Sequence, residues 1–171
     1  FNLANAGKQS TYGVEIDSVF RPADPLPIAF ALTWLAPTYD SFEGAEGESG
    51  PVDLSGTRPA GIHEWSTNLS GTYDFDIGSR QGFIRAEWLY ESEVQVIENV
   101  PESVASREVN VINASMGLGL TDSIDVMIWG RNLTDDDYLF SAFPSVAQAG
   151  SYSGYPNQPR TYGITLTAWF D

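Results

Sequence analysis

Hydrophobic and polar residues alternate with a period of two along most of the chain. The clearest stretch is the last, where Tyr162, Ile164, Leu166 and Phe170 alternate with threonines and a glycine. Such alternation places apolar residues on one face of a β-strand and polar residues on the other. Seven such segments are predicted, at residues 10–20, 28–35, 64–75, 83–91, 109–120, 124–131 and 161–170. Helical periodicity is not evident, so the chain is predicted to be all-β.

The connections between these segments alternate in length. Short connections follow the odd-numbered segments, at residues 21–27, 76–81 and 121–123. Long connections follow the even-numbered ones, at residues 36–63, 94–108 and 139–159. A membrane β-barrel has short turns on one side and longer loops on the other. A β-sandwich with Greek-key connections has no reason to alternate in this way.

The polar faces of the predicted strands carry many charged residues. These are Glu15, Asp17, Glu64, Asp74, Arg85, Glu87, Asp125 and Arg131. Periodicity alone fits both the lumen of a barrel and the wet face of a soluble sandwich, but the loop alternation favours the barrel. Seven strands cannot close a bacterial barrel, which needs an even number of at least about eight. The chain is therefore predicted to form about seven strands of a larger antiparallel transmembrane β-barrel.

Composition and charge narrow the classes of partner. The 171 residues are 13% aromatic and 18% charged, which suits strands that face lipid between aromatic girdles. No run of eighteen apolar residues occurs, which excludes a transmembrane helix. The net charge of -15 argues against nucleic acid, because no basic patch exists to displace counterions. Cysteine is absent, so disulfides are excluded. The start lacks the basic and apolar regions of a signal peptide, so either a signal was removed or the chain begins partway through a longer protein.

Four segments resemble motifs of the C-terminal barrel of TonB-dependent receptors, in the order in which that family carries them. They are Asn5-Ala-Gly-Lys8 with Thr11-Tyr-Gly-Val-Glu15, Asp53-Leu-Ser-Gly-Thr-Arg-Pro59 with Trp65-Ser66, Trp129-Gly-Arg-Asn-Leu-Thr-Asp135 with Tyr138, and Pro159-Arg-Thr-Tyr-Gly-Ile164. The third is the most specific, and together they span nearly the whole chain. The motif residues assigned by this resemblance are Gly13, Glu15, Asp53, Gly56, Arg131, Asn132, Leu133, Asp135, Tyr138, Arg160, Tyr162 and Gly163.

The resemblance implies that residues 1–171 are the C-terminal part of a 22-stranded barrel, whose N-terminal plug domain is absent from this chain. It implies a receptor in the outer membrane of a Gram-negative bacterium. This receptor would bind a siderophore, cobalamin or a saccharide and import it with TonB-supplied energy, with no cofactor and no catalysis. The implied partners are the TonB complex through the absent N-terminal region, membrane lipid, and the outer-membrane assembly machinery. The assembly machinery would read the final strand through Tyr162, Ile164, Leu166 and Phe170. Two alternatives stay open: a small complete outer-membrane barrel and a soluble carbohydrate-binding β-sandwich.

Candidate ligand contacts are assigned to the long loops, where functional contacts concentrate. They are Tyr39, Phe42, Arg58, Phe140, Phe143, Tyr152 and Tyr155. Packing of these loops on one another is the alternative role for the same residues.

No catalytic or metal-binding group is predicted. His63, the single histidine, has no partners at metal-ligand spacing and is expected where the chain enters a strand. The run Asp135 to Asp137 lacks the remaining ligands of a Ca²⁺ loop and is expected at a solvated strand end. Glu87 and Glu91 share a face, as the paired carboxylates of a glycosidase would, but lining a lumen is the simpler interpretation.

Overall fold

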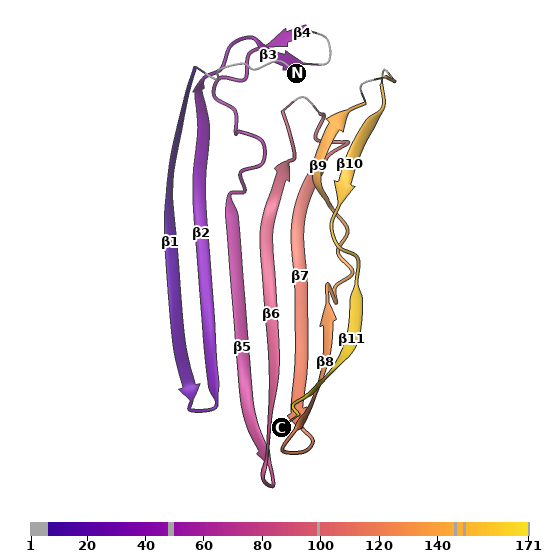
Figure 1. Cartoon of the computed structure of the whole chain (residues 1–171). Coiled ribbons are helices and arrows are strands. Elements are labelled where there is room, and N and C mark those ends of the chain that lie inside the picture. Colours follow the sequence, from indigo (N-terminus) through magenta and orange to yellow (C-terminus); the bar gives the residue numbers. More distant parts are fainter. Residues whose placement is uncertain (1–6, 48–49, 99, 146, 149, 171) are drawn as a thin grey trace.

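A computed structural model describes residues 7–47, 50–98, 100–145, 147–148 and 150–170 (Figure 1). Seven strands form one antiparallel sheet, in the order β1 Lys8–Ala23, β2 Leu26–Ser41, β5 Trp65–Ile77, β6 Arg80–Gln95, β7 Ser106–Gly119, β8 Ile124–Arg131 and β11 Thr161–Ala168. Two small two-stranded sheets lie within the loops: β3 Ala45–Gly47 with β4 Gly50–Val52, and β9 Leu139–Pro144 with β10 Tyr152–Pro156. The prediction of an all-β antiparallel chain is confirmed.

All seven predicted strands are present, and most are longer than their apolar patterns. The connection predicted at residues 21–27 is only a turn at Asp24 and Pro25, because the flanking residues continue the pairing of β1 with β2. β2 likewise continues to Ser41, beyond the expected end at Leu35. The four short strands in the loops were not predicted, since each has too few residues to show a period.

The strands pair in a register that keeps the alternation in phase across the sheet. Phe30 pairs with Leu69, Leu69 with Trp88, and Trp88 with Ile112. On the opposite side of the sheet, Arg85 pairs with Ser115, which pairs with Trp129. The side that carries the first row is called the apolar face below, and the side that carries the second row the polar face. A shift of one residue in any pairing would mix the two faces.

The sheet is a single layer that is not closed. The apolar cluster of buried residues, centred on Val100, Ala105 and Ala142, lies in the loops rather than beneath the strands. Within the described residues, β1 and β11 are the free edges of the sheet and do not pair with each other. The soluble sandwich is therefore wrong, because no second layer covers either face of this sheet in the described part of the chain. The described part of the chain does not form a closed barrel by itself, because these seven strands leave both edges open.

Aromatic side chains mark two levels on the apolar face. Trp34 and Trp65 lie with ring centres 6.2 Å apart at one level, and Tyr73 and Phe75 lie 6.3 Å apart at the other. The ten residues from Trp65 to Phe75 span about 33 Å along β5 at about 3.3 Å per residue. With a strand tilt of about 40°, the two levels are about 25 Å apart, the height of the apolar band of outer-membrane barrels.

The residues between these levels are large and exposed. Leu69, Ile84 and Ile128 are 39%, 47% and 49% accessible to solvent. Soluble monomers rarely expose a contiguous apolar surface of this extent.

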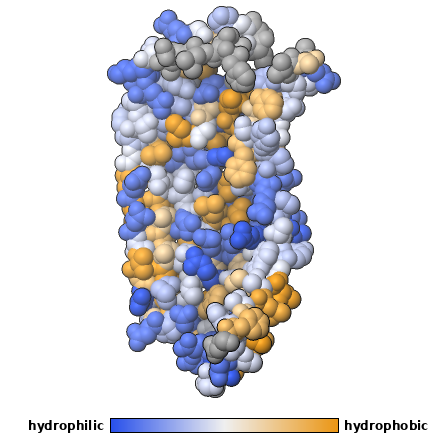
Figure 2. Space-filling model, viewed as in Figure 1, coloured by the Kyte–Doolittle hydropathy of each residue, from blue (hydrophilic) through white to orange (hydrophobic). Residues whose placement is uncertain are grey.

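The two ends of the sheet differ, as the alternation of connection lengths predicted. Short turns gather at one end and the long connections, with β3, β4, β9 and β10, at the other (Figure 1). On the side of the molecule shown in Figure 2, hydrophilic side chains extend along the whole length of the sheet. Among the described residues, no helix is long and apolar enough to cross a membrane.

Candidate functional site

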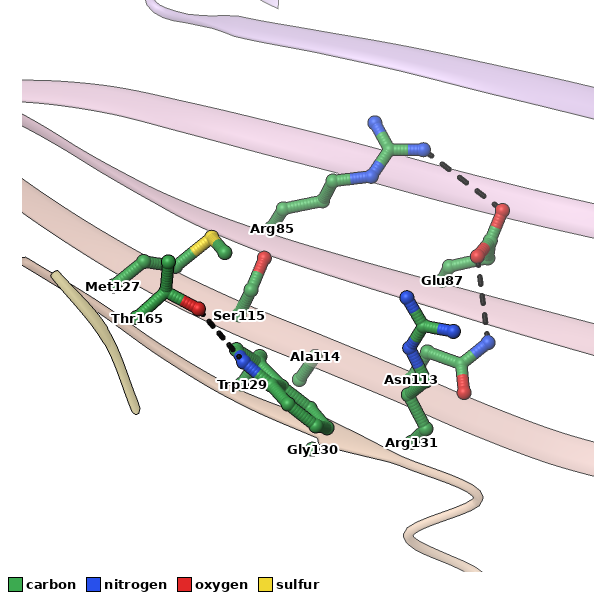
Figure 3. Close-up of a pocket in the computed structure, with 10 residues that line it drawn as sticks. All are labelled: Arg85, Glu87, Asn113, Ala114, Ser115, Met127, Trp129, Gly130, Arg131 and Thr165. Atoms are coloured by element: carbon green, nitrogen blue, oxygen red, sulfur yellow. Dashed lines mark hydrogen bonds and ion pairs between the residues drawn. The ribbon is translucent and has the colours of Figure 1, made fainter. Parts of the chain in front are cut away.

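A groove on the polar face brings together charged side chains from neighbouring strands. It consists of two adjoining hollows of about 440 and 500 Å³ that share Glu87, Asn113 and Arg131. The hollow toward the short turns is lined also by Arg85, Ala114, Ser115, Met127, Trp129, Gly130 and Thr165 (Figure 3). The hollow toward the long loops is lined also by Val111, Asn132, Tyr138, Phe140, Asn157 and Gln158. The groove, called the Arg131 groove below, thus extends from the middle of β11 to the hairpin of β9 and β10.

Strand alternation aims most of these side chains into the groove. Glu87 and Asn113 are paired residues on β6 and β7, and the Asn113 amide donates to Glu87 Oε2 at 3.4 Å. The other carboxylate oxygen, Oε1, lies 3.8 Å from Nη2 of Arg85. Arg131, on β8, places its guanidinium carbon 5.7 Å from the centre of the Trp129 ring, within the usual range of a cation–π contact. The groove therefore holds two guanidinium groups and one carboxylate.

A glycine lets Trp129 lie across the neighbouring strand. Gly163 pairs with Trp129, and a Cβ at that glycine would lie 2.5 Å from the indole ring. Trp129 Nε1 donates to Oγ1 of Thr165 at 3.2 Å, which fixes the direction of the ring. This close approach explains why the motif carries glycine at position 163. Gly13 has a similar role at the other edge, because its Cβ would collide with the carbonyl oxygen of Trp34.

Asn132 organises the turn that leaves β8. It is 5% exposed and has a left-handed backbone with φ of 50°, which asparagine adopts more readily than most residues. Its Oδ1 accepts the N–H of Asp136 at 2.9 Å. Its Nδ2 donates to the carbonyls of Asp136 and Gln158 at 2.8 and 3.1 Å. Its own N–H donates to Oδ1 of Asn113 at 3.0 Å, which ties the turn to β7.

Asn157 completes this turn from the other side and was not predicted. It is 7% exposed, and its Nδ2 donates to the Asp136 carbonyl at 2.8 Å. It also exchanges hydrogen bonds with the backbone of Tyr138, at 2.9 and 3.1 Å. A single asparagine in a long loop has no periodic signal, so only the fold reveals this partnership.

The neighbouring motif residues hold the same turn. Asp135 pairs with Arg160 at 2.9 Å, and Leu133 donates its N–H to the Ile112 carbonyl at 2.8 Å. Asp136 Oδ2 accepts the N–H of Asn110 at 2.6 Å. These contacts place two of the three aspartates at the end of a strand in structural roles. Among the described residues, no group of three or more acidic or histidine side chains could hold a metal ion.

His63 lies in a polar cluster at the loop end of the sheet. It is 8% exposed, and its Nδ1 donates to the carbonyl of Ser92. Its Nε2 lies 2.6 Å from Nη2 of Arg107 and 3.0 Å from Oε2 of Glu91. The histidine thus attaches the chain before β5 to β6 and β7. Arg107 lies outside the alternating segment expected from residue 109, so the pattern did not indicate it.

Tyr138 lies near this cluster. Burial, and next the negative charge of Glu91, raise the pKa of Tyr138 above its usual value. The neutral hydroxyl can serve as a hydrogen-bond donor at the wall of the groove.

The first long loop is held by local contacts. The Tyr39 hydroxyl donates to Oε1 of Glu98 at 2.6 Å, and Tyr39 is only 7% exposed. Phe42 packs against Tyr39 edge-on at 4.9 Å, and Arg58 pairs with Glu64 at 2.7 Å. The structure thus places Tyr39 in a packed position, whereas Arg58 remains partly exposed.

The Asp53 motif closes a turn within this loop. The Ser55 side chain and backbone hydrogen-bond the Asp53 carboxylate, which lowers the pKa of Asp53. The Gly56 N–H donates to the Tyr39 carbonyl at 2.7 Å. This turn therefore folds back onto the end of β2.

The aromatic loop is a β-hairpin formed by β9 and β10. Phe143 and Tyr155 lie with ring centres 5.9 Å apart and are 37% and 65% exposed. Phe140, 55% exposed, lines the Arg131 groove, and Tyr152 packs against the buried loop cluster. Three of the four predicted aromatic contacts therefore face solvent or the groove, and their role as ligand contacts stays a prediction.

Three of the proposed assembly residues form an apolar row on β11, which ends at Ala168 and not at residue 170 as predicted, so Phe170 lies two residues beyond the strand. Tyr162, Ile164 and Leu166 are 71%, 69% and 69% exposed, and Phe170 is 92% exposed. Glu15 lies on the polar face of the opposite edge strand, paired with Thr33. Asn5 of the first motif lies outside the described residues.

No model of a protein family matches the chain, and no curated protein is similar to it in sequence. Solved structures do match. The ferric yersiniabactin uptake receptor FyuA from Yersinia pestis matches 99% of this chain with a TM-score of 0.76 and 18% identity. This chain has the fold of a siderophore-receptor barrel wall. The siderophore receptor PiuA and the ferric preacinetobactin receptor BauA, both from Acinetobacter baumannii, match 92% and 94% of it, with TM-scores of 0.68 and 0.64 and identities of 16% and 14%.

The chain corresponds to a fraction of each of these receptors. It spans 25%, 21% and 22% of the three solved chains. The predicted resemblance to the barrel of TonB-dependent receptors is thus confirmed for the fold, and the similar structures are receptors rather than enzymes.

Proposed function

We propose that this chain forms part of the barrel wall of a TonB-dependent receptor in the outer membrane of a Gram-negative bacterium. The full receptor imports a siderophore-class ligand with energy supplied through TonB. The observation that carries the proposal is the match of nearly the whole sheet to siderophore receptors, with a TM-score of 0.76 for FyuA. Because a fold alone does not determine a function, the surfaces of this chain must also suit a receptor in a membrane.

Three features of the chain support a position in the membrane. The apolar face is exposed between two aromatic levels about 25 Å apart, which suits lipid contact. The polar face carries the Arg131 groove and suits a water-filled or protein-filled lumen. The long connections gather at one end and supply surfaces that a ligand meets first. The hydrogen bonds of the His63 cluster and of the Asn132 turn hold these loops in an ordered conformation.

The proposed partners follow from these surfaces. Membrane lipid contacts the apolar face, and the assembly machinery reads the apolar row of β11. The TonB complex contacts a region outside this chain. The chain itself supplies wall and loops, so binding and passage of the ligand require the rest of the receptor.

An uptake experiment tests this proposal. A strain that lacks the gene is complemented with the full-length gene, and uptake of ⁵⁵Fe bound to siderophores from its own culture medium is measured under iron limitation. Uptake should return with the gene and should disappear when TonB is also deleted. Uptake that does not depend on the gene, or persists fully without TonB, would contradict the proposal.

A further inference from the structure

The apolar face of the sheet is not flat. Gly71 on β5 pairs with Ala86 on β6, so two small residues lie side by side on this face. Two paired rows of large side chains flank them, Leu69 with Trp88 and Tyr73 with Ile84. A hollow of about 590 Å³ therefore opens above Gly71 and Ala86, and its surface is almost wholly apolar. A Cβ at Gly71 would have its nearest neighbour 3.7 Å away, so the hollow has room for added atoms.

One wall of this hollow is held in place by contacts outside it. Trp88 Nε1 donates to Oδ1 of Asn110 at 2.8 Å. The Trp88 ring also stacks on Tyr90, with ring centres 5.9 Å apart. These contacts oppose a rotation of the indole that would close the hollow. A hollow that exists before its occupant arrives loses less conformational entropy when it is filled.

The hollow lies on the part of the surface that faces the membrane in the proposed function. Tyr73 belongs to the aromatic level nearer the short turns, and it lines the hollow. Phe20 and Leu26, which flank the turn at Asp24 and Pro25, line the same end. Short turns of outer-membrane barrels face the periplasm. The lipids on that side of the membrane are phospholipids, so phospholipid acyl chains surround the hollow.

Further strands of a complete barrel do not reach the floor of the hollow. Both sheet neighbours of β5 and of β6 belong to this chain, so additional strands join the sheet only beyond β1 or β11. A protein segment in the hollow would bring backbone polar groups that this apolar lining cannot satisfy. An acyl chain has no such groups, and it restores the dispersion contacts that an empty space would lose.

We propose that this hollow, called the Gly71 hollow below, binds one acyl chain of a phospholipid from the periplasmic leaflet. Gly71 and Ala86 form its floor, and Trp88 and Tyr73 stand on opposite sides. The inference rests on the proposed position in the outer membrane and goes beyond it. It adds a lipid held at a fixed place to the lipids that exchange freely along the apolar face.

The test titrates phosphatidylethanolamine into delipidated full-length receptor in detergent and measures the lipid-bound fraction by native mass spectrometry. The first lipid should bind the unmodified receptor more tightly than those that follow. Gly71→Leu puts a side chain into the hollow and should weaken binding of the first lipid about fivefold, through lost packing contacts. Thr67→Leu adds a leucine to the same face of β5 outside the hollow, and it should leave the affinity unchanged.

A second variant covers a failure of Gly71→Leu to fold, which heat modifiability detects. Ala86→Leu fills the hollow from β6 and should weaken binding to a similar extent. Equal affinity of the first lipid in the unmodified receptor and in the folded hollow variants would overturn the site. So would an unmodified receptor whose first lipid binds no more tightly than the rest.

The same spectra distinguish other occupants. Tighter binding of lipopolysaccharide than of phosphatidylethanolamine at the hollow, or a receptor dimer that Gly71→Leu dissociates, would overturn the phospholipid assignment. The site and the transport function can fail separately. Gene-dependent ⁵⁵Fe uptake without a tightly bound first lipid leaves transport standing, whereas lipid binding lost in Gly71→Leu stands even if uptake persists without TonB.

Discussion

Asn132 allows the strongest quantitative prediction. Its side chain forms hydrogen bonds with buried backbone groups, and asparagine adopts a left-handed backbone more readily than most residues. It is 5% exposed and its φ is 50°. The perturbation is a series of three substitutions, Asn132→Gly, Asn132→Ala and Asn132→Asp. Glycine removes the side-chain hydrogen bonds but keeps the backbone conformation accessible. Alanine removes the same bonds and adds backbone strain. Aspartate keeps the acceptor and replaces the amide donor with a second acceptor.

The magnitudes follow from the contacts. Asn132→Gly leaves the Asp136 N–H without its acceptor, which now lies at 2.9 Å. The carbonyls of Asp136 and Gln158 lose the Asn132 amide but keep Asn157 Nδ2 as a donor, at 2.8 and 3.4 Å. Leaving a buried group unsatisfied costs about 1–3 kcal/mol, so we expect a loss of about 2 kcal/mol. Asn132→Ala should cost about 1 kcal/mol more, because a left-handed backbone is unfavourable for a residue with a Cβ. Asn132→Asp should cost at least as much as glycine, since a carboxylate then faces the carbonyls of Asp136 and Gln158.

The assay is amide hydrogen exchange of residues 132–138 in the full-length receptor. Protection should fall about 30-fold in Asn132→Gly and about a further 5-fold in Asn132→Ala, at about 1.4 kcal/mol per factor of ten. Asn68→Ala on β5 is the control and should leave exchange of residues 132–138 unchanged. Unaltered protection in Asn132→Gly would refute the hydrogen-bond argument, and equal exchange in the glycine and alanine variants would refute the backbone argument.

The remaining predictions concern packing, assembly and ligand contact. Gly163→Val should lower the heat-modifiable folded fraction several-fold, because the valine side chain collides with Trp129. The control Gly71→Ala should fold normally, because the nearest neighbour of the added Cβ is 3.7 Å away. Equal folding of both variants would show that Trp129 can move aside. Phe170→Asp should reduce the amount of receptor inserted in the outer membrane, with Tyr155→Asp as the exposed aromatic control, and normal insertion would contradict a role for β11 in assembly. The double substitution Phe143→Ala with Tyr155→Ala should weaken binding of the ferric siderophore without changing the folded fraction, and unchanged affinity would remove the β9–β10 hairpin from the ligand contacts.

The strands and their faces could be predicted because apolar and polar residues alternate in the sequence of a sheet that has one apolar and one polar face. The sets around Leu69, Trp88 and Ile112 were each assigned to the correct face, and the register then aligned them. Strand ends could not be predicted, because β1 continues to Ala23 through residues that do not alternate, with an irregular register between Phe20 and Ala23.

The groove could be predicted only in part. Arg85, Glu87 and Arg131 were assigned to the polar face, and the Asn132 motif was recognised as a unit. The stacking of Arg131 on Trp129 and the contacts of Asn157 and Arg107 depend on residues distant in sequence, so no local pattern contains them. Tyr39 and Tyr152 were predicted to contact the ligand, but both are packed in the structure. The sequence does not distinguish a packed aromatic residue in a loop from an exposed one.

The central claim is that the apolar face contacts lipid and the polar face does not. Because this chain has no cysteine, single cysteines at residues 69–73 of β5 can carry a spin label one at a time in the full-length receptor, with cysteines elsewhere replaced. In proteoliposomes, accessibility to oxygen and to a water-soluble nickel complex is then measured. Labels at Leu69, Gly71 and Tyr73 should favour oxygen, and labels at Ser70 and Thr72 should favour the nickel complex or neither reagent. Equal access of the nickel complex to both sets of positions would contradict the account.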